Sequence, residues 1–354
     1  MDKIIFFKIS GFNLWNGGLN YLKQLKKNLK NESIDVVIII NDFDLIGIKK
    51  LEENSIHYKK IITKKYFRFF NLFLLKIGLS FSVLKPHKKL NSKVKIFYHG
   101  LIPVSYLFTQ NILIYWLPDI LHEIYPKNFS KFHYYKRYLF TIINLKLTNQ
   151  ILLSSHSIKN QLKKRYKISK KIFIYQFSSF APLVSNFNIN FTKPVVLFPH
   201  EFWTHKRQEK IIELANNNDD YLFILTGNNR KNQRNSSFSK FNIKLKFLKN
   251  NNLLNLGEVD WKFLIELYSH ADYIGNVSDY EGWNTSVEMA KSLNKKLILS
   301  KIDVHIEQTL NYNKVIWHDS SIKLPRFINN NPEYSYNKEF SERLNLFCLE
   351  LFSE

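Results

Sequence analysis

The sequence predicts an α/β protein made of two doubly wound domains that face each other across a cleft. Strand-like runs of β-branched and aromatic residues alternate with longer amphipathic stretches, and this alternation occurs in two separate series along the chain. The length of 354 residues suits about two domains of ordinary size. Together these observations favour two domains over one compact domain.

The first series contains KIIFFKI (3–9), LNYLKQLKKNLK (19–30) and DVVIII (35–40). The second series contains PVVLFPH (194–200), RQEKIIELANN (207–217), YLFILTG (221–227), KLKFLKN (244–250), WKFLIELYSHA (261–271), DYIGNVS (272–278), EMAKSLN (288–294) and KLILS (296–300). An alternation of this kind is typical of a parallel sheet covered by helices.

A segment with two prolines and many asparagines, APLVSNFNINFTKP (181–194), separates the two series and is predicted to be a linker. We therefore expect domains at 1–185 and 186–354, with the last helix packing back on the first domain. The polar stretch NNRKNQRNSSFSK (228–240) is predicted to be a mobile loop.

Cysteine content and apolar runs bear on where the protein resides. The single cysteine, Cys348, excludes an intramolecular disulfide and favours a reducing compartment. The start of the chain lacks the long apolar region of a signal peptide. The most apolar windows, 66–84 and 96–118, are interrupted by charged residues, glycine or proline, so no transmembrane segment is expected. A cytoplasmic protein is predicted.

Positive charge is concentrated in the first part of the chain. Residues 1–190 hold 31 Lys and Arg against 9 Asp and Glu, a net charge of +22, whereas residues 191–354 hold 21 against 20. This asymmetry indicates an anionic partner, for which membrane phospholipid, a lipid-diphosphate acceptor and nucleic acid are candidates. A solvated Lys-rich surface without a partner is the alternative.

Ligands of open α/β sheets bind beyond the carboxyl ends of the strands, so polar residues at those positions are the site candidates. Gly17 and Gly18 follow the first strand, where backbone amides approach a ligand closely; a purely geometric turn explains them equally well. Asp119 and His122 follow the strand that contains Trp116 and suit acid-base chemistry, whereas a helix cap is the alternative for Asp119. A metal site at Asp119, His122 and Glu123 lacks a second well-spaced histidine pair.

The second domain offers two further candidates. Lys206 and Arg207 stand at the entrance of a helix, where cations cost stability unless an anion such as phosphate lies between them and the helix. In the stretch SDYEGWNTSVEMAKS (278–292), residues 284–286 are of the types that cap a helix and leave amides for an anion. Glu281 precedes them and suits the hydroxyls of a sugar better than a phosphate.

These residues resemble the retaining glycosyltransferases of family 4, which have the GT-B fold of two Rossmann-like domains. The similarity covers most of the chain and is carried by EGWNTSVEMAKSLNKKLILS (281–300), SKIDVHIEQ (300–308), FWTHK (202–206), WLPDILH (116–122) and SSHS (154–157). The resemblance implies transfer of a sugar from a nucleotide-diphosphate sugar, held mainly by the second domain, to an acceptor held mainly by the first. It implies retention of anomeric configuration without an obligatory metal.

The resemblance also distributes roles. Lys206 corresponds to the family's phosphate-contacting lysine and Glu281 to the first acid of its paired-glutamate motif. The family's arginine five residues before that lysine is Glu201 here, which leaves Arg207 or His205 to supply the second cation. The second motif acid is expected at Met289, whereas Glu288 stands one residue earlier, about 100° around the helix. Glu288 can make the ribose contact of the second motif acid only if the helix is rotated or the nucleotide binds in a different position.

The predicted catalytic residues are Glu281, Asp119 and His122. The predicted donor-binding residues are Gly17, Gly18, His205, Lys206, Arg207, Tyr280, Gly282, Trp283, Asn284, Thr285, Ser286 and Glu288. No metal and no cofactor are predicted beyond the nucleotide-sugar donor. The expected acceptor is a glycan or a lipid-linked sugar in the synthesis of cell-surface polysaccharide or lipopolysaccharide.

The predicted location is the inner face of the cell membrane, where the basic first half meets anionic lipid at about 1 kcal/mol per basic residue near the surface. Two other classes remain as alternatives: a nucleotide-sugar epimerase of the same fold, and a basic nucleic-acid-binding protein, for which no reading motif is present. The donor sugar, nucleotide, acceptor and linkage are left open by the sequence.

Overall fold

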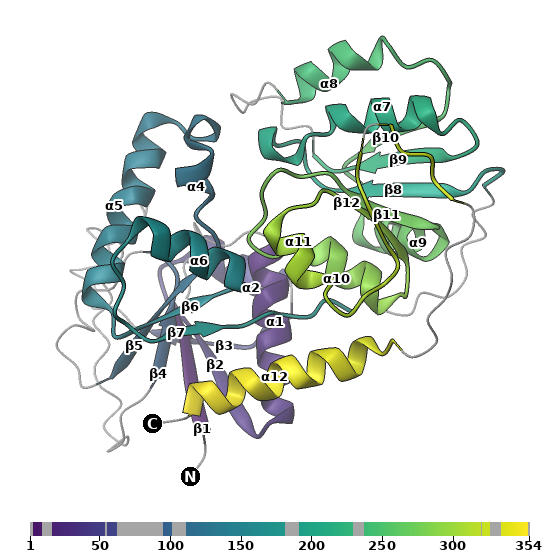
Figure 1. Ribbon diagram of the computed structural model, residues 1–354. Helices are drawn as coiled ribbons and strands as arrows, with labels where there is room; N and C mark the ends of the chain where they lie inside the picture. Colours follow the sequence, from purple (N-terminus) through teal and green to yellow (C-terminus); the bar gives the residue numbers. More distant parts are fainter. Residues whose placement is uncertain are drawn as a thin grey trace. The chain divides into compact units, whose positions relative to one another are not determined.

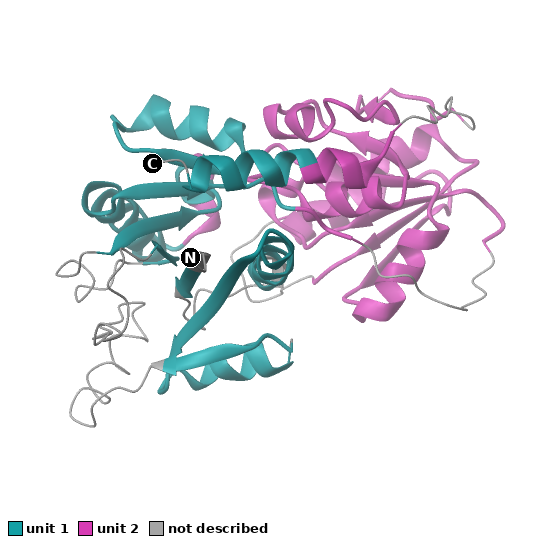
Figure 2. Ribbon diagram, turned by 90° about the horizontal axis from the view of Figure 1, so that it is seen from below, with its two compact units in different colours: residues 1–123, 130–177, 342–354 teal, residues 124–129, 178–341 magenta. Residues whose placement is uncertain are grey.

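The computed structural model describes residues 3–8, 16–53, 55–61, 95–100, 111–180, 191–228, 237–319, 321–325 and 334–352 (Figure 1). The chain forms two compact units, coloured separately in Figure 2. Unit 1 comprises residues 1–123, 130–177 and 342–354, and unit 2 comprises residues 124–129 and 178–341. The predicted boundary at 185 falls outside the described residues.

Unit 1 contains a seven-stranded sheet of order β3-β2-β1-β4-β5-β6-β7 in which every pair is parallel. Its strands are β1 (Lys3–Lys8), β2 (Ile34–Asn41), β3 (Tyr58–Ile61), β4 (Lys95–Tyr98), β5 (Ile112–Leu117), β6 (Gln150–Leu153) and β7 (Ile172–Ile174). Its helices are α1 (Asn16–Asn31), α2 (Leu45–Glu53), α4 (Leu121–Ile124), α5 (Lys131–Leu147) and α6 (His156–Arg165). The 3-10 turn η3 (Pro126–Asn128) lies between α4 and α5 in the chain and belongs to unit 2.

Aromatic packing fills the centre of unit 1. Trp116 on β5 is buried and stacks on Tyr21 of α1 with ring centroids 4.4 Å apart, and it meets Phe7 of β1 edge-on. Serine caps start the neighbouring helices: Ser155 accepts a hydrogen bond from the Ile158 amide at the start of α6. Trp116 therefore belongs to the core, although it belongs to a motif that carries the family resemblance.

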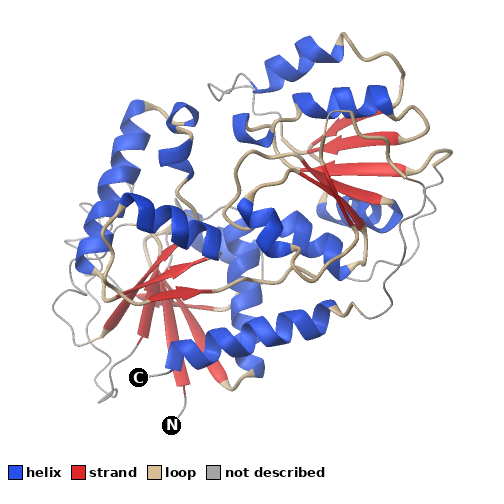
Figure 3. Ribbon diagram, viewed as in Figure 1, coloured by secondary structure: helices blue, strands red, loops and turns tan. Residues whose placement is uncertain are grey.

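Unit 2 contains a six-stranded parallel sheet of order β10-β9-β8-β11-β12-β13. Its strands are β8 (Val195–Pro199), β9 (Leu222–Thr226), β10 (Leu253–Gly257), β11 (Tyr273–Asn276), β12 (Lys296–Leu299) and β13 (Val315–Trp317). Its helices are the 3-10 turn η4 (Thr204–Lys206), α7 (Glu209–Asn217), α8 (Ser237–Leu245), α9 (Trp261–His270), α10 (Thr285–Ser292) and α11 (Asp303–Gln308). The last helix, α12 (Tyr336–Phe352), begins in unit 2, and its residues from 342 onward belong to unit 1. Figure 3 shows the strands of each sheet flanked by helices.

Two glycines allow close approaches in unit 2. A Cβ atom on Gly275 in β11 would lie 2.2 Å from the ring of Phe198 on β8. Gly227, just beyond β9, has φ of +120°, and a Cβ atom there would lie 2.5 Å from the carbonyl oxygen of His200. Gly227 requires glycine because backbone atoms occupy the space of a side chain at a positive φ, whereas at Gly275 the space is occupied by a side chain.

The prediction of two doubly wound parallel α/β domains is confirmed by the two sheets. Two local expectations differ. The run KLKFLKN (244–250) lies at the end of α8 and in the turn after it, and the strand β10 follows. In the stretch 228–240, residues 237–240 begin α8, and residues 229–236 lie outside the described part. Within the described ranges, no helix combines the length and apolarity needed to span a membrane.

Candidate functional site

The elbow between β11 and α10 forms the centre of the candidate site in unit 2. Asn284 caps α10, because its Oδ1 accepts hydrogen bonds from the amides of Ser286 and Val287 at 2.9 and 3.3 Å. Gln308 at the end of α11 accepts from the Asn284 amide at 3.2 Å and donates to the Asn284 carbonyl at 3.1 Å. The Thr285 amide has no acceptor in the described part of the chain. The elbow is thus fixed by its own side chains and retains one amide for an anion.

Lys206 and Glu281 come together at this edge of the sheet. Lys206 lies at the end of η4, after β8, and Glu281 lies in the elbow after β11. The Lys206 Nζ atom donates to Glu281 Oε1 at 2.5 Å, and Asn276 Nδ2 donates to the same oxygen at 3.2 Å. The lysine and glutamate side chains are only 15% and 9% exposed. They form a nearly buried ion pair at the carboxyl ends of two neighbouring strands.

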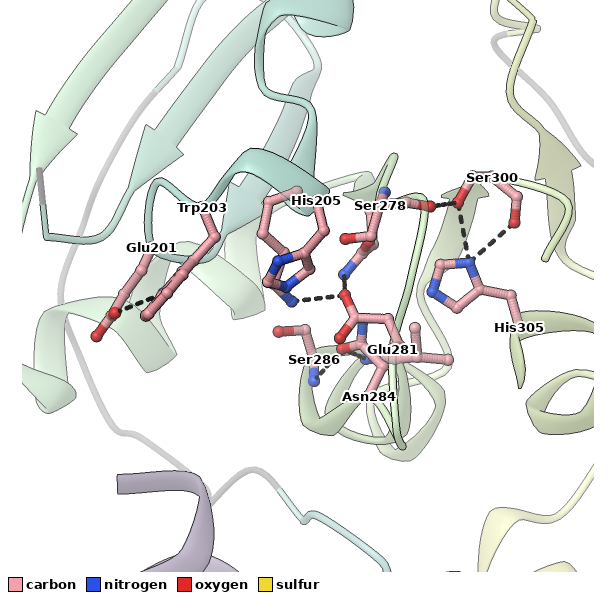
Figure 4. Close-up of polar contacts among 12 residues, drawn as sticks. Glu201, Trp203, His205, Ser278, Glu281, Asn284, Ser286, Ser300 and His305 are labelled. Atoms are coloured by element: carbon pink, nitrogen blue, oxygen red, sulfur yellow. Dashed lines mark hydrogen bonds and ion pairs between the residues drawn. The ribbon is translucent and has the colours of Figure 1, made fainter. Parts of the chain in front are cut away.

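The charge of Glu281 is stabilised by its surroundings. Burial raises the pKa of this carboxyl, but Lys206, His205 and His305 outweigh burial and lower the pKa to about 2. The carboxylate is therefore ionised at neutral pH, and its second oxygen can accept hydrogen bonds. Figure 4 shows Glu281 between His205 and His305.

Three neutral histidines surround this pair. Burial and the neighbouring Lys206 lower the pKa of His200 to about 3 and that of His205 to about 4. Burial lowers the pKa of His305 to about 4, although Glu281 opposes the shift. His205 Nδ1 lies 3.3 Å from Asn128 Nδ2, and the ring of Tyr125 lies nearby. At neutral pH these imidazoles supply hydrogen-bonding groups without adding positive charge.

The polar atoms of His200 and His305 are incompletely satisfied. His305 Nδ1 lies 2.9 Å from the carbonyl oxygen of Ser300, which places the proton on Nδ1 and leaves Nε2 as an acceptor. The buried Nε2 of His305 and both buried ring nitrogens of His200 have no hydrogen-bond partner in the described residues. Unsatisfied buried nitrogens beside a charged pair are typical of a site that binds a polar ligand.

Arg207 and Lys210 are engaged by acidic residues. Arg207 adopts a left-handed backbone conformation with φ of 55°, and its Nε lies 3.1 Å from Asp279 and 3.2 Å from Glu209. Lys210 Nζ lies 2.9 Å from the other Asp279 oxygen. In this structure the charge of Arg207 is therefore neutralised by Asp279 and Glu209, whereas Lys206 pairs with Glu281.

Glu288 lies in a buried network rather than at the elbow. Its Oε1 accepts from Gln308 Nε2 at 3.1 Å and its Oε2 accepts from the Tyr336 hydroxyl at 2.9 Å. Lys291 Nζ lies 3.9 Å from Glu288 and 2.7 Å from Glu339, and the Glu288 and Lys291 side chains are fully buried. Glu288 thus joins α10 to α11 and α12. Met289 is buried in the apolar core beside it.

The remaining donor-binding candidates lie in both units. In unit 2, Tyr280 and Trp283 of the elbow are buried, Gly282 lies between them, and the Ser286 hydroxyl donates to the Pro199 carbonyl at 3.4 Å. In unit 1, Gly17 and Gly18 lie in the first turn of α1, where helical amides have no intrahelical acceptor.

The two other catalytic candidates, Asp119 and His122, lie at the start of α4 in unit 1. Asp119 Oδ1 accepts from the Leu121 amide at 2.9 Å, so it caps this turn. His122 is buried and its ring nitrogens have no hydrogen-bond partner in the described ranges, although Nε2 lies 3.6 Å from a Glu123 oxygen. Burial and Arg137 lower the pKa of His122 to about 4, so the ring is neutral. No group of three or more metal-ligating side chains occurs among the described residues.

Four residues of the site were not predicted from the sequence: His200, Asn276, His305 and Gln308. His200 and Asn276 end two strands at the carboxyl edge of the sheet, which is a usable signal. His305 and Gln308 belong to the SKIDVHIEQ segment that carried part of the family resemblance.

The two parallel sheets and the polar cluster at a carboxyl edge define a doubly wound α/β protein, a class in which ligands bind beyond the carboxyl ends of the strands. Solved structures narrow the fold to GT-B. A glycosyltransferase from Rickettsia africae is similar with a TM-score of 0.60 and 17% identity, over 91% of this chain and 86% of its own. HepE from Anabaena, solved with UDP and glucose, is similar with a TM-score of 0.58 and 15% identity, over 87% of this chain and 83% of its own. TarM of S. aureus is similar with a TM-score of 0.60 and 12% identity, over 99% of this chain and 93% of its own.

These likenesses establish the GT-B fold of glycosyltransferases for this chain. No protein-family model and no curated protein sequence matches it.

Proposed function

We propose that the protein transfers a sugar from a nucleotide-diphosphate sugar to a glycan or lipid-linked acceptor, with retention of anomeric configuration. The observation that carries this proposal is the Lys206–Glu281 pair. It combines a cation for a diphosphate with an ionised carboxylate for sugar hydroxyls at the edge where α/β folds bind nucleotides. The fold is that of HepE, which was solved with UDP-glucose.

The donor is proposed to lie across the elbow of unit 2. Its diphosphate approaches Lys206 Nζ and the Thr285 amide at the start of α10, where the helix dipole favours negative charge. Its sugar hydroxyls donate to the free oxygen of Glu281 and to His305 Nε2, which are both acceptors at neutral pH. In unit 1, His122 and Asp119 are proposed to orient the acceptor hydroxyl or the sugar.

Transfer is proposed to take place on one face of the sugar. The bond between the anomeric carbon and the phosphate oxygen breaks, the acceptor hydroxyl forms its bond from the same side, and the departing phosphate oxygen takes the hydroxyl proton. Lys206 stabilises the charge that develops on the diphosphate, as preorganised electrostatic catalysis requires. Glu281 already binds Lys206 and Asn276 and therefore suits positioning better than attack on the anomeric carbon.

A screen of nucleotide sugars for thermal stabilisation tests the donor site. A specific donor at about 100 times its Kd is expected to add about 2.7 kcal/mol to the free energy of unfolding. The stabilisation should be lost in Lys206→Ala and kept in Lys210→Ala, a matched control whose lysine pairs with Asp279. If a donor stabilised Lys206→Ala as much as Lys210→Ala, or if no donor stabilised the wild-type protein, the assignment of Lys206 to the donor site would be contradicted.

Product analysis tests the reaction. A transferase converts donor rapidly only when an acceptor is present, whereas a nucleotide-sugar epimerase of the same fold changes the donor alone. Nuclear magnetic resonance of the product should show the anomeric configuration of the donor, and inversion would contradict the front-face route.

The acceptor class is proposed to be a lipid-linked glycan used in cell-surface polysaccharide or lipopolysaccharide synthesis. The protein would meet this acceptor at the inner face of the membrane, because residues 1–190 carry a net charge of +22.

A further inference from the structure

The helix α5 has an inverted distribution of polarity. In an ordinary surface helix the apolar face is buried and the polar face is solvated. In α5 the two buried residues are polar, Thr141 and Asn144. Four of its large apolar side chains are exposed, Phe132, Tyr135, Leu139 and Leu147, at 63%, 64%, 53% and 47%, whereas the apolar residues between Leu139 and Leu147 are half-buried. Exposed apolar patches of this kind mark interaction sites.

The exposed apolar residues share one side of α5. At about 100° per residue, Phe132, Tyr135 and Leu139 fall within roughly 60° of one another around the helix axis. Lys131 and Lys146 are exposed at the two ends of the same side. We call the surface formed by Phe132, Tyr135, Leu139 and Leu147, with Lys131 and Lys146, the α5 face.

The opposite side of α5 is held firmly on unit 1. Asn144 Nδ2 donates to the Gly100 carbonyl at 2.6 Å, and Asn144 Oδ1 accepts from the Tyr98 hydroxyl at 3.3 Å. Lys170 donates to the carbonyl of Lys146 at 2.8 Å in the last turn. These contacts fix the orientation of the helix and keep the α5 face outward.

The segment of the chain that contains α5 is rich in positive charge. Residues 124–200 contain no Asp or Glu, whereas they contain 13 Lys and Arg. Within α5 itself the charged residues are Lys131, Lys136, Arg137 and Lys146. In the C-terminal turn of α6, Lys163 and Lys164 add positive charge, whereas Arg165 pairs with Glu123 at 3.6 Å. A partner with both an apolar layer and negative charge complements this surface.

We propose that the α5 face docks on the surface of an anionic phospholipid bilayer, with the helix lying in the plane of the interface. Aromatic and leucine side chains enter the boundary between headgroups and acyl chains, and lysines contact anionic headgroups. A helix of 17 residues is about 26 Å long, which suits an interfacial orientation. The α5 face belongs to unit 1 and the elbow belongs to unit 2, so the test of the α5 face does not depend on sugar transfer.

Vesicle co-sedimentation of the full chain tests the proposal. The protein should sediment with vesicles that contain phosphatidylglycerol and much less with vesicles of phosphatidylcholine alone. Lys131→Gln with Lys146→Gln should weaken binding to the anionic vesicles roughly 30-fold, at about five-fold per lysine. Phe132→Ser with Leu139→Ser should weaken it more than about ten-fold, because two apolar side chains no longer leave water.

Matched controls, called the α8 variants, come from α8 and the turn that follows it in unit 2. Phe247 and Ile243 are 70% and 60% exposed, and Lys240 and Lys246 are exposed beside them. Phe247→Ser with Ile243→Ser, and Lys240→Gln with Lys246→Gln, should leave vesicle binding unchanged. All variants replace exposed residues, so each should keep the wild-type Tm.

The outcomes separate the occupants. Loss of binding in the α5 variants alone, with donor-induced thermal stabilisation retained, supports the proposal. Equal loss in the α5 and α8 variants, no sedimentation with anionic vesicles, or concentration-dependent dimerisation abolished by Phe132→Ser with Leu139→Ser would overturn it. Quenching of Phe132→Trp fluorescence by lipids brominated on their acyl chains should place the helix at the interface, and absence of quenching would contradict insertion.

Discussion

Lys206 and Glu281 are 75 residues apart in the sequence and form an ion pair of 2.5 Å at the carboxyl edge of one sheet. The pair lies between the neutral imidazoles of His205 and His305 and the amides of the elbow. Its consequence is that the two groups assigned to diphosphate and sugar hold each other in place before any ligand binds.

Breaking this pair on one side should destabilise the fold. Glu281→Ala leaves the nearly buried Lys206 ammonium without its carboxylate partner. Lys206→Ala leaves the nearly buried Glu281 carboxylate without its ammonium partner. Each is expected to lower the free energy of unfolding by about 3 kcal/mol, whereas the double variant should cost less than the sum, because no unpaired charge remains. Urea denaturation of the four proteins measures the coupling, and strict additivity would contradict a direct pair.

Acid should destabilise the protein through His305. The pKa of this buried imidazole is about 4 in the folded state against 6.5 ordinarily, so the unfolded chain binds the proton first. Stability is therefore fully present above pH 6.5 and is lost as pH falls towards 4, by up to about 3 kcal/mol from this group. His305→Asn can keep the donation to Ser300 and should flatten this part of the stability profile. An unchanged slope between those pH values would refute the assignment.

The pH window of Glu281 lies lower. Its pKa is about 2 in the folded state against 4.5 ordinarily, so its contribution is present above pH 4.5 and is lost as pH falls towards 2. Glu281→Gln should remove this second acid transition and keep the first. Chemical denaturation at a series of pH values distinguishes the two transitions, and a transition near pH 3 that survives in the variant would show that another group causes it.

Replacing Glu288 should affect stability more than donor affinity. Glu288→Gln keeps the size of the side chain but removes the charge beside Lys291 and one acceptor for Gln308 and Tyr336. We expect a loss of about 1 to 3 kcal/mol in the free energy of unfolding, with donor Kd unchanged within about two-fold. Calorimetric titration with the donor found in the screen gives the Kd. A large loss of affinity at unchanged stability would instead assign Glu288 to the nucleotide.

The two close-packed glycines should respond differently to alanine. Gly275→Ala places a methyl group against the Phe198 ring and should cost about 1 to 3 kcal/mol, much of it recovered in combination with Phe198→Leu. Gly227→Ala meets the backbone of His200 at a φ of +120° and should cost about 3 kcal/mol or more. Thermal unfolding of the single and double variants checks both, and failure of Phe198→Leu to rescue Gly275→Ala would contradict the packing.

Local sequence signals predicted the elements of the fold well. The apolar alternation located β1, β2, β8, β9 and β11, and residues of capping type marked the start of α10 at Asn284. KLKFLKN misled because its lysines and leucines suit a helix end as well as a strand, and it is the following segment, β10, that pairs with β9. The facing of the two domains across a cleft stays a prediction.

The candidate site was predictable in part. Position at a strand end and the chemistry of the side chain were enough to select Lys206 and Glu281. The acceptor nitrogen of His305 could not be predicted from the sequence. The tautomer of this histidine depends on the carbonyl of Ser300, which lies within hydrogen-bonding distance only in the folded turn. The sequence spacing did not decide whether Glu288 contacts the nucleotide. In the folded chain, Glu288 accepts hydrogen bonds from Gln308 of α11 and Tyr336 of α12.

Local sequence patterns account for the parallel α/β architecture and the capped elbow, because alternation and capping depend on neighbours within a few residues. The tertiary structure decided which charges meet. Lys206 reaches Glu281 while Arg207 is taken by Asp279, and Lys291 lies buried between Glu288 and Glu339. It also decided that α5 packs with Thr141 and Asn144 inward and leaves Phe132 and Leu139 outside. Such pairings depend on long-range packing, which the composition and periodicity of one segment do not contain.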